Sequence, residues 1–182
     1  MYDMIYMSLE LIRGKHRGKE MTMNKYIYPY RVSVVREKTD RYPQVSSSME
    51  LRAIANEFLA DAATERFLVF FLDTKNRITG FNETSVGSLN SSVVHPRDTM
   101  RAAVIQGASS IVLVHNHPSG YPTPSREDRE TTKRLCHAGR ILGIRVLDHI
   151  VVGDGNYFSF ADACMLEDFG EPDINIALGK AS

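Results

Sequence analysis

The chain has 182 residues, of which 43% are hydrophobic and 24% are charged, as expected for one globular domain with a sizeable core. Its 22 Lys and Arg residues balance its 22 Asp and Glu residues, so the chain as a whole has no net charge that would draw it to nucleic acid or to an anionic membrane. No stretch approaches the roughly 18 apolar residues of a membrane span, and two cysteines are too few for a disulfide framework, which favours a cytoplasmic protein with no membrane partner.

Residues 1–44 are expected to form an N-terminal extension that is partly disordered. Residues 1–41 carry nine basic against five acidic side chains, whereas residues 42–182 carry thirteen against seventeen. The alternation in RVSVVRE predicts one edge strand over 31–37. We expect the polar residues 1–22 to be mostly disordered, with Met23 as a candidate start, and they do not show the pattern of a signal peptide.

The next segments predict a helix followed by a hairpin. Ser48 is the predicted N-cap of the helix, because the apolar residues after it recur at helical spacing. The continuous apolar run FLVFFLD over 67–73 predicts a strand that is buried on both faces. The residues TKNR provide a turn, and residues 78–90 are predicted to return as the second strand of the hairpin.

The rest of the chain alternates helices and strands. A helix is predicted from Pro96 to Gly107, a buried strand over 110–116 and a second helix over 125–142 that ends at Gly143. The second helix is expected to point Leu135, Ala138, Ile141 and Leu142 inward. IRVLDHIVVG and NYFSF complete the sheet, so the fold class is α/β (α+β), a mixed β-sheet flanked by helices in the order β-α-β-β-α-β-α-β-β.

Three side chains after the buried strand form a candidate metal site. His115 and His117 are two residues apart on a strand and therefore point to the same side, and Asp128 begins the next helix. Two imidazoles and one carboxylate are a usual ligand set for a catalytic zinc that keeps a fourth position open. Taken alone, His-x-His also occurs as ordinary polar residues at a strand end, and Ser125 with Asp128 also fits a capping box.

The joint spacing H-x-H, seven residues, S, two residues, D resembles the signature of JAMM (MPN-plus) metalloproteases. The segments HNHPSGYPTPSRED, SVVHPRD and LGIRVLDHIVVG resemble the RadC-like branch of that superfamily, over about residues 45–160. The resemblance implies a JAMM/MPN-like catalytic domain over 45–165 and a C-terminal tail over 166–182. It also implies one zinc ion per chain, with His115, His117 and Asp128 as metal ligands.

The same resemblance implies the catalytic roles and the substrate. Glu83 would take a proton from the attacking water, and Ser125 would donate a hydrogen bond to the developing oxyanion. The expected reaction is hydrolysis of a peptide or isopeptide amide in a protein or peptide substrate. His149 is either an outer partner that orients a ligand or a satisfied core histidine, and His95 either lines the cleft or has no role in it. Asn116 should face the other side of the strand and Cys136 should be a small core residue.

Two other functions stay open at this point. Full-length RadC-like proteins carry an N-terminal helix-hairpin-helix module that this sequence does not show, yet a DNA repair or replication accessory protein, or a metal-dependent nuclease, remains an alternative. A non-catalytic MPN-type interaction module is disfavoured because the ligand set is present. The sequence does not indicate the oligomeric state.

Overall fold

The computed structural model describes residues 43–59, 62–86 and 94–170. They form a five-stranded mixed sheet in the order β2-β1-β3-β4-β5. The strands are β1 (Arg66–Leu72), β2 (Ile78–Val86), β3 (Ser110–Asn116), β4 (Arg145–Val152) and β5 (Tyr157–Ser159). The predicted edge strand 31–37 and the rest of the predicted extension up to residue 42 lie outside the described residues.

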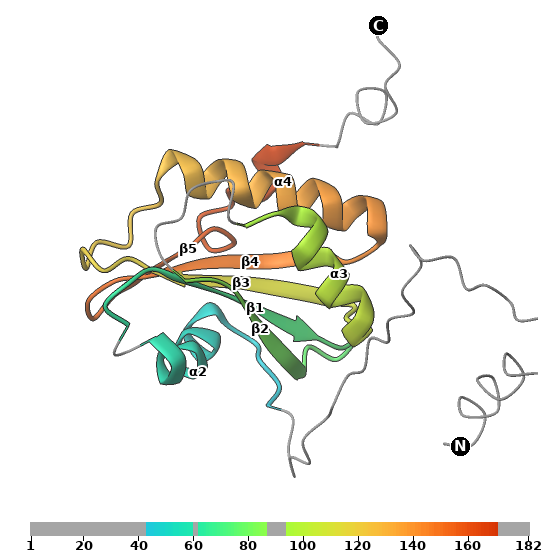
Figure 1. The fold of residues 1–182 in the computed structure, drawn as a ribbon, viewed down its shortest axis with the longest axis horizontal. Coiled ribbons are helices and arrows are strands. Elements are labelled where there is room, and N and C mark those ends of the chain that lie inside the picture. The colour runs from blue at the N-terminus through green and yellow to red at the C-terminus, as the bar shows by residue number, and fades with distance from the viewer. Residues whose placement is uncertain (1–42, 60–61, 87–93, 171–182) are drawn as a thin grey trace, which may run out of the picture. The chain divides into compact units, whose positions relative to one another are not determined.

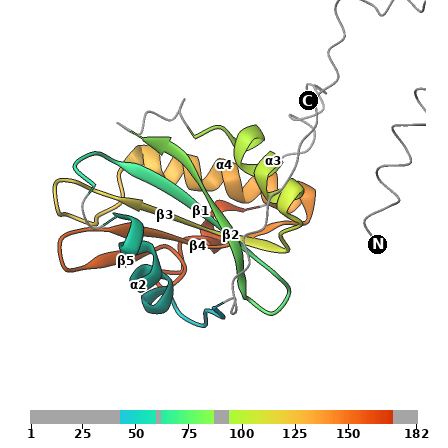
Figure 2. The same cartoon turned by 60° about the horizontal axis from the view of Figure 1, so that its bottom comes forward.

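Helices cover both faces of the sheet (Figures 1 and 2). α2 (Ser48–Leu59) lies on one face, and α3 (Pro96–Gln106) and α4 (Arg126–Leu142) lie on the other. β1 is antiparallel to both β2 and β3, whereas β3 and β4 are parallel and are connected through α4. The predicted mixed sheet flanked by helices is confirmed, and so is the order of its elements from the first helix onwards. Among the described residues, no helix combines the length and the apolar character needed to cross a membrane.

Alternation along the central strands produces two separate hydrophobic cores. Side chains such as Leu68 and Val114 pack with α2, whereas their neighbours Phe67 and Leu113 pack with α3 and α4. We call these sides of the sheet the α2 face and the α4 face. Because β1 and β3 are buried on both faces, their sequences read as unbroken apolar runs.

The predicted ends of α3 and α4 are confirmed. Pro96 occupies the first turn of α3, and Gly107 and Gly143 follow the two helices with φ of 69° and 70°. This left-handed conformation favours glycine, whose missing Cβ removes the steric penalty.

Two details of the helix predictions are wrong. The N-cap of α2 is Ser47, whose hydroxyl accepts from the Glu50 N–H at 3.2 Å, because the hydroxyl of Ser48 instead donates to Asp162 at 2.6 Å. Ile141 and Leu142 are 59% and 51% exposed. The buried side of α4 passes through Leu135 and Gly139, so Ile141 falls on the opposite side of the helix, and Leu142 is the last residue before the chain turns away.

Candidate metal centre

The three predicted metal ligands come from two adjoining elements. His115 is near the end of β3, His117 follows that strand by one residue, and Asp128 lies in the first turn of α4. β3 is buried on both faces, and α4 packs over the α4 face. The ligands therefore meet between the end of β3 and the first turn of α4, at the edge of the core. His115 and Asp128 are buried, and the His117 side chain is 13% exposed, so the group has one side towards solvent.

The ligand atoms lie at distances that suit a bound metal ion. The Nε2 atoms of His115 and His117 are 3.0 Å apart, and the Asp128 carboxylate oxygens are 3.2 Å from His115 Nε2 and 3.4 Å from His117 Nε2. Ligands held tetrahedrally at the usual zinc bond lengths of 2.0–2.1 Å would be about 3.3 Å apart. One ligand atom from each of the three residues lies within 4.8 Å of the others, and this is the group found among the described residues that could hold a metal ion.

A hydrogen bond fixes the orientation of the His117 ring. Its Nδ1 lies 2.7 Å from the carbonyl oxygen of Tyr121, which can only accept, so Nδ1 carries the proton. In the neutral ring, Nε2 then presents a lone pair to the other two ligands. Without a metal ion, the hydrogen bond with Asp128 raises the pKa of His117, which shows that this nitrogen faces a position where positive charge is stabilised.

Asp128 is oriented by the first turn of its own helix. Its Oδ2 accepts from the backbone N–H and the hydroxyl of Ser125, both at 2.7 Å, while its own N–H donates to the Ser125 hydroxyl oxygen at 3.1 Å. Burial alone would raise the pKa of Asp128, but His115 and His117 hold it far below its usual range. The carboxylate is therefore ionised, as a metal ligand must be.

Ser125 has a structural role that the sequence left open. It is the N-cap of α4 and forms a complete capping box with Asp128. Its hydroxyl hydrogen points to the Asp128 carboxylate. The capping interpretation is confirmed, and its predicted hydrogen bond to an oxyanion stays a prediction.

Two further buried side chains, His149 and Thr132, continue from His115 on the side away from the other ligands. His115 Nδ1 is 2.8 Å from His149 Nε2, and His149 Nδ1 is 2.6 Å from the Thr132 hydroxyl. Burial lowers the pKa of His149 well below its ordinary value, so the ring is neutral. Both interpretations of His149 fit the structure, because it is a fully buried histidine with partners at both ring nitrogens, and one of these partners is the candidate ligand His115.

Glu83 lies outside this group. Its carboxylate forms a bidentate ion pair with the Arg66 guanidinium, and the hydrogen bonds from Arg66 lower the pKa of Glu83. Glu83 pairs in register with Leu68, which faces α2, and Arg66 also donates to the Phe58 carbonyl oxygen of α2. The structure therefore directs Glu83 to the α2 face, whereas His115 stacks against Phe67 on the α4 face. The proton-acceptor role of Glu83 stays a prediction.

A carboxylate near the ligands that sequence reasoning missed is Glu65, which directly precedes β1. Its charge is one of the further causes, after Asp128 and Tyr121, that raise the pKa of His117. Glu65 is two residues before Phe67, and an extended chain directs side chains at this spacing to the same face of a sheet. A sequence signal existed in this two-residue spacing, but it becomes informative only when the pairing of Phe67 with His115 is known.

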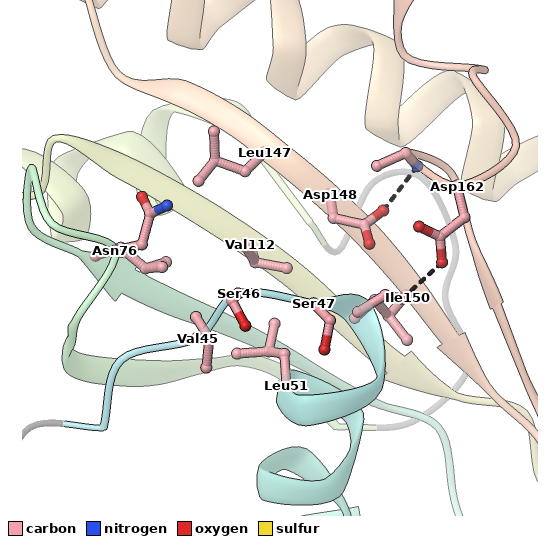
Figure 3. Close-up of a pocket in the computed structure, with 13 residues that line it drawn as sticks. Val45, Ser46, Ser47, Leu51, Asn76, Val112, Leu147, Asp148, Ile150 and Asp162 are labelled. Carbon is pink, nitrogen blue, oxygen red and sulfur yellow. Dashed lines mark hydrogen bonds between the residues drawn. The ribbon is translucent and has the colours of Figure 1, made fainter.

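Two hollows border the α2 face of the sheet. A cleft of about 310 Å³ is bordered by α2 on one side and by His117, Pro118 and residues 152–155 on the other. Gly153 allows the loops here to approach, because a Cβ at this position would lie 2.4 Å from the Gly120 carbonyl oxygen. A second hollow of about 230 Å³ lies on the α2 face, where Asp148 and Asp162 are already hydrogen-bonded within the protein (Figure 3). The cleft, and not the second hollow, reaches a metal-ligand candidate.

The remaining predicted residues have structural roles. His95 is the N-cap of α3, where its Nδ1 accepts from the Arg97 N–H at 3.1 Å. Asn116 faces away from the ligands, as predicted, and holds the segment before β1 by bonds to Ala62, Thr64 and Arg66. Cys136 is buried, as expected for a core residue, and burial raises the pKa of its thiol to about 11.

Comparisons with known proteins agree with the geometry. The family model described as RadC-like JAB domain matches residues 45–165. A UPF0758 protein from Trichlorobacter lovleyi is 56% identical over 108 residues, which are 59% of this chain and 47% of the relative. UPF0758 proteins from Geotalea uraniireducens and Methanosarcina mazei are 49% and 43% identical over 71% and 65% of this chain, and over 56% and 52% of their own lengths. The chain spans about half the length of the curated relatives it matches.

Proposed function

Because the chain belongs to the RadC-like JAB domain family, we propose that it is a zinc-dependent hydrolase that cleaves a peptide or isopeptide amide. The family match indicates a JAMM-type metallohydrolase fold. The observation that carries the proposal is the convergence of two imidazole nitrogens and one carboxylate at 3.0–3.4 Å, on a side open to solvent.

In this proposal His115, His117 and Asp128 hold the zinc ion. One carboxylate and two neutral imidazoles compensate only part of the charge of a divalent ion, so the site keeps its electrophilic character. Zinc in such a site supplies Lewis acidity, which polarises a carbonyl group and makes water a nucleophile at neutral pH. The nearly complete burial of His115 and Asp128 protects two ligands from exchange with water.

Two carboxylates are candidates for moving the proton from the attacking water to the leaving amine. Glu65 is supported by its electrostatic effect on His117. Glu83, the residue inferred from the family resemblance, would first have to exchange its ion pair with Arg66 for contact with the substrate water. We rank Glu65 ahead of Glu83 because the charge of Glu65 acts on His117.

Ser125 is the proposed donor to the oxyanion, and the cleft beside His117 is the proposed entry for the substrate. The Ser125 hydroxyl can rotate away from Asp128 while its backbone N–H continues to hold the carboxylate. The polar lining of the cleft, which includes Asn116, Asp154 and Arg52, suits a peptide backbone better than an apolar ligand.

The first experiment is metal analysis of the purified full chain and of the His117→Ala variant. We expect close to one zinc ion per wild-type chain and loss of the metal from the variant. A wild-type protein that folds and hydrolyses its substrate without bound metal would contradict the proposal.

The second experiment presents the zinc-loaded protein with a pool of peptides, with isopeptide-linked peptides, and with single-stranded and duplex DNA. Cleavage of an amide that requires the metal supports the proposed reaction. Cleavage of DNA alone would instead support the metal-dependent nuclease, and salt-dependent binding of DNA without cleavage would support the accessory protein.

A further inference from the structure

A chain of four buried groups connects the strand ligand to the helix ligand behind the candidate metal position. It runs from His115 on β3 through His149 on β4 and Thr132 on α4 to the backbone carbonyl of Asp128. The successive distances are 2.8, 2.6 and 2.5 Å. His115, His149 and Thr132 are 0% exposed, and Asp128 is 4% exposed, so water does not compete for these bonds.

Counting the available hydrogens gives each bond a direction. A backbone carbonyl can only accept, so the single hydroxyl hydrogen of Thr132 goes to Asp128. The Thr132 oxygen must then accept from His149 Nδ1, and the neutral His149 ring keeps an unprotonated Nε2. That nitrogen accepts from His115 Nδ1. When the His115 ring carries a single proton, that proton is on Nδ1 and the lone pair is on Nε2, the nitrogen that lies near His117 and Asp128.

The ring of His149 is also fixed in its plane. It stacks on Phe160 with ring centroids 5.0 Å apart and an angle of 14°, and it meets Phe67 edge-on at 5.4 Å. Phe67 in turn stacks on His115 at 5.8 Å. Because both nitrogens of His149 are bonded and its faces are packed, the ring has one orientation in which all contacts are kept.

We propose that His149 and Thr132 are positioning residues, which fix the tautomer of His115 and hold the strand ligand at a set distance from the helix ligand before a metal ion binds. The inference rests on the proposed metal site but concerns groups that do not touch the metal. The buried hydrogen bonds of His149 and Thr132 should therefore increase the metal affinity of the site, because ligands that are already ordered lose little entropy when the metal binds.

A matched pair of threonine variants tests this role. Thr132 and Thr99 are both helical and 0% exposed, but the Thr99 hydroxyl has no hydrogen-bond partner among the described residues. Valine has nearly the shape of threonine. Thr132→Val therefore removes the hydrogen bonds of the hydroxyl to His149 and Asp128, whereas Thr99→Val removes no hydrogen bond seen among the described residues. Competition titrations with zinc and spectroscopic titrations with cobalt should show a metal dissociation constant raised about 10–100-fold in Thr132→Val. Equal affinities in the two variants would overturn the proposal.

Two substitutions of His149 separate hydrogen bonding from packing. Gln at this position can still accept from His115 Nδ1, whereas Phe keeps the ring and loses both hydrogen bonds. We expect His149→Gln to retain more metal affinity than His149→Phe at equal folded fraction. The reverse order would contradict the assigned direction of the bond.

The tautomers can be measured directly in the metal-free wild-type chain by long-range proton–nitrogen correlation of its histidine rings. We expect protonated Nδ1 and unprotonated Nε2 on both His115 and His149, and loss of this pattern at His115 in Thr132→Val. A protonated Nε2 on His115 in the wild type would overturn the proposal. Since this measurement needs neither metal nor substrate, it distinguishes failure of the positioning role from failure of the proposed function.

Discussion

Polar side chains on the two faces of the sheet have different kinds of partner. On the α2 face, the Asn116 amide is hydrogen-bonded to backbone groups, and the Glu83 carboxylate forms an ion pair with Arg66. On the α4 face, the Nδ1 atoms of His115 and His117 have hydrogen-bond partners within the protein. Their Nε2 atoms instead lie 3.0 Å from each other and 3.2–3.4 Å from the Asp128 carboxylate. Lone pairs and negative charge at these distances repel one another unless a cation or a proton lies between them. The difference teaches that a metal site is indicated by ring nitrogens and a carboxylate that converge on one point, and not by the presence of paired polar groups in general.

The largest effect on metal affinity is expected from Asp128→Asn, which changes the only carboxylate of the ligand group. The amide keeps the shape of the side chain but loses the charge that binds the cation, so the metal dissociation constant should rise by more than about 100-fold, beyond what the loss of an outer partner costs. Isothermal titration with zinc measures it. Glu127→Gln, an exposed acid in the same helical turn, is the control and should leave the affinity nearly unchanged. Similar losses in both variants would show that the general charge of the turn, and not Asp128, binds the metal.

The next comparison sets Glu65, whose charge acts on His117, against Glu83, which lies on the α2 face. Glu65→Gln should lower kcat about 10²–10⁴-fold at unchanged zinc content, as expected when a group that transfers a proton is removed. Glu83→Gln should lower it much less, since Glu83 is occupied by Arg66. Kinetics on the amide substrate found in the screen, with the metal content measured in parallel, decide between them. A large loss in Glu83→Gln alone would restore Glu83 as the proton acceptor and require the Arg66 pair to open.

On the α2 face, Asn116→Ala should affect stability and not the metal. The side chain accepts from the Arg66 N–H at 2.8 Å and donates to the Thr64 carbonyl at 3.1 Å, so its removal should lower the free energy of unfolding by about 1–3 kcal/mol. Denaturant unfolding measures this change. Zinc affinity of the folded variant should stay within about twofold of the wild type, and a loss comparable to that of Asp128→Asn would contradict the separation of the two faces.

The smallest expected effect is the pH dependence of the Glu83–Arg66 ion pair. The side-chain hydrogen bonds from Arg66 lower the pKa of Glu83, so the stability that the pair contributes is complete above the ordinary glutamate pKa and is lost as pH falls through the lower, folded-state pKa. Because both side chains are partly exposed, the contribution should be about 1 kcal/mol or less. Denaturation of wild type and Glu83→Gln between neutral and acid pH should show a difference that shrinks with acidification. A difference that grows towards acid pH would mean that the pair does not stabilise the folded chain.

Much of the fold and the ligand set could be predicted from local pattern. The apolar runs of β1 and β3, the Pro96 start and Gly107 end of α3, and the spacing of His115, His117, Ser125 and Asp128 all depend on chemistry within a few residues of chain. Successive side chains of a strand point to opposite faces, and acidic residues are favourable in the first turn of a helix, wherever these elements lie in the fold. Such features can therefore be predicted without knowing the tertiary structure.

What the sequence could not decide depends on which strands become neighbours. Phe67 lies opposite His115, and Glu83 is turned to the α2 face by its register with Leu68. His149 contacts His115 across 34 residues of chain through the parallel pairing of β4 with β3. Sequence alone determined which side chains could hold a metal ion. Tertiary structure decided which buried groups contact the ligands and on which face Glu83 lies, because strand register and the face of the sheet are set by packing between segments that are distant in the chain.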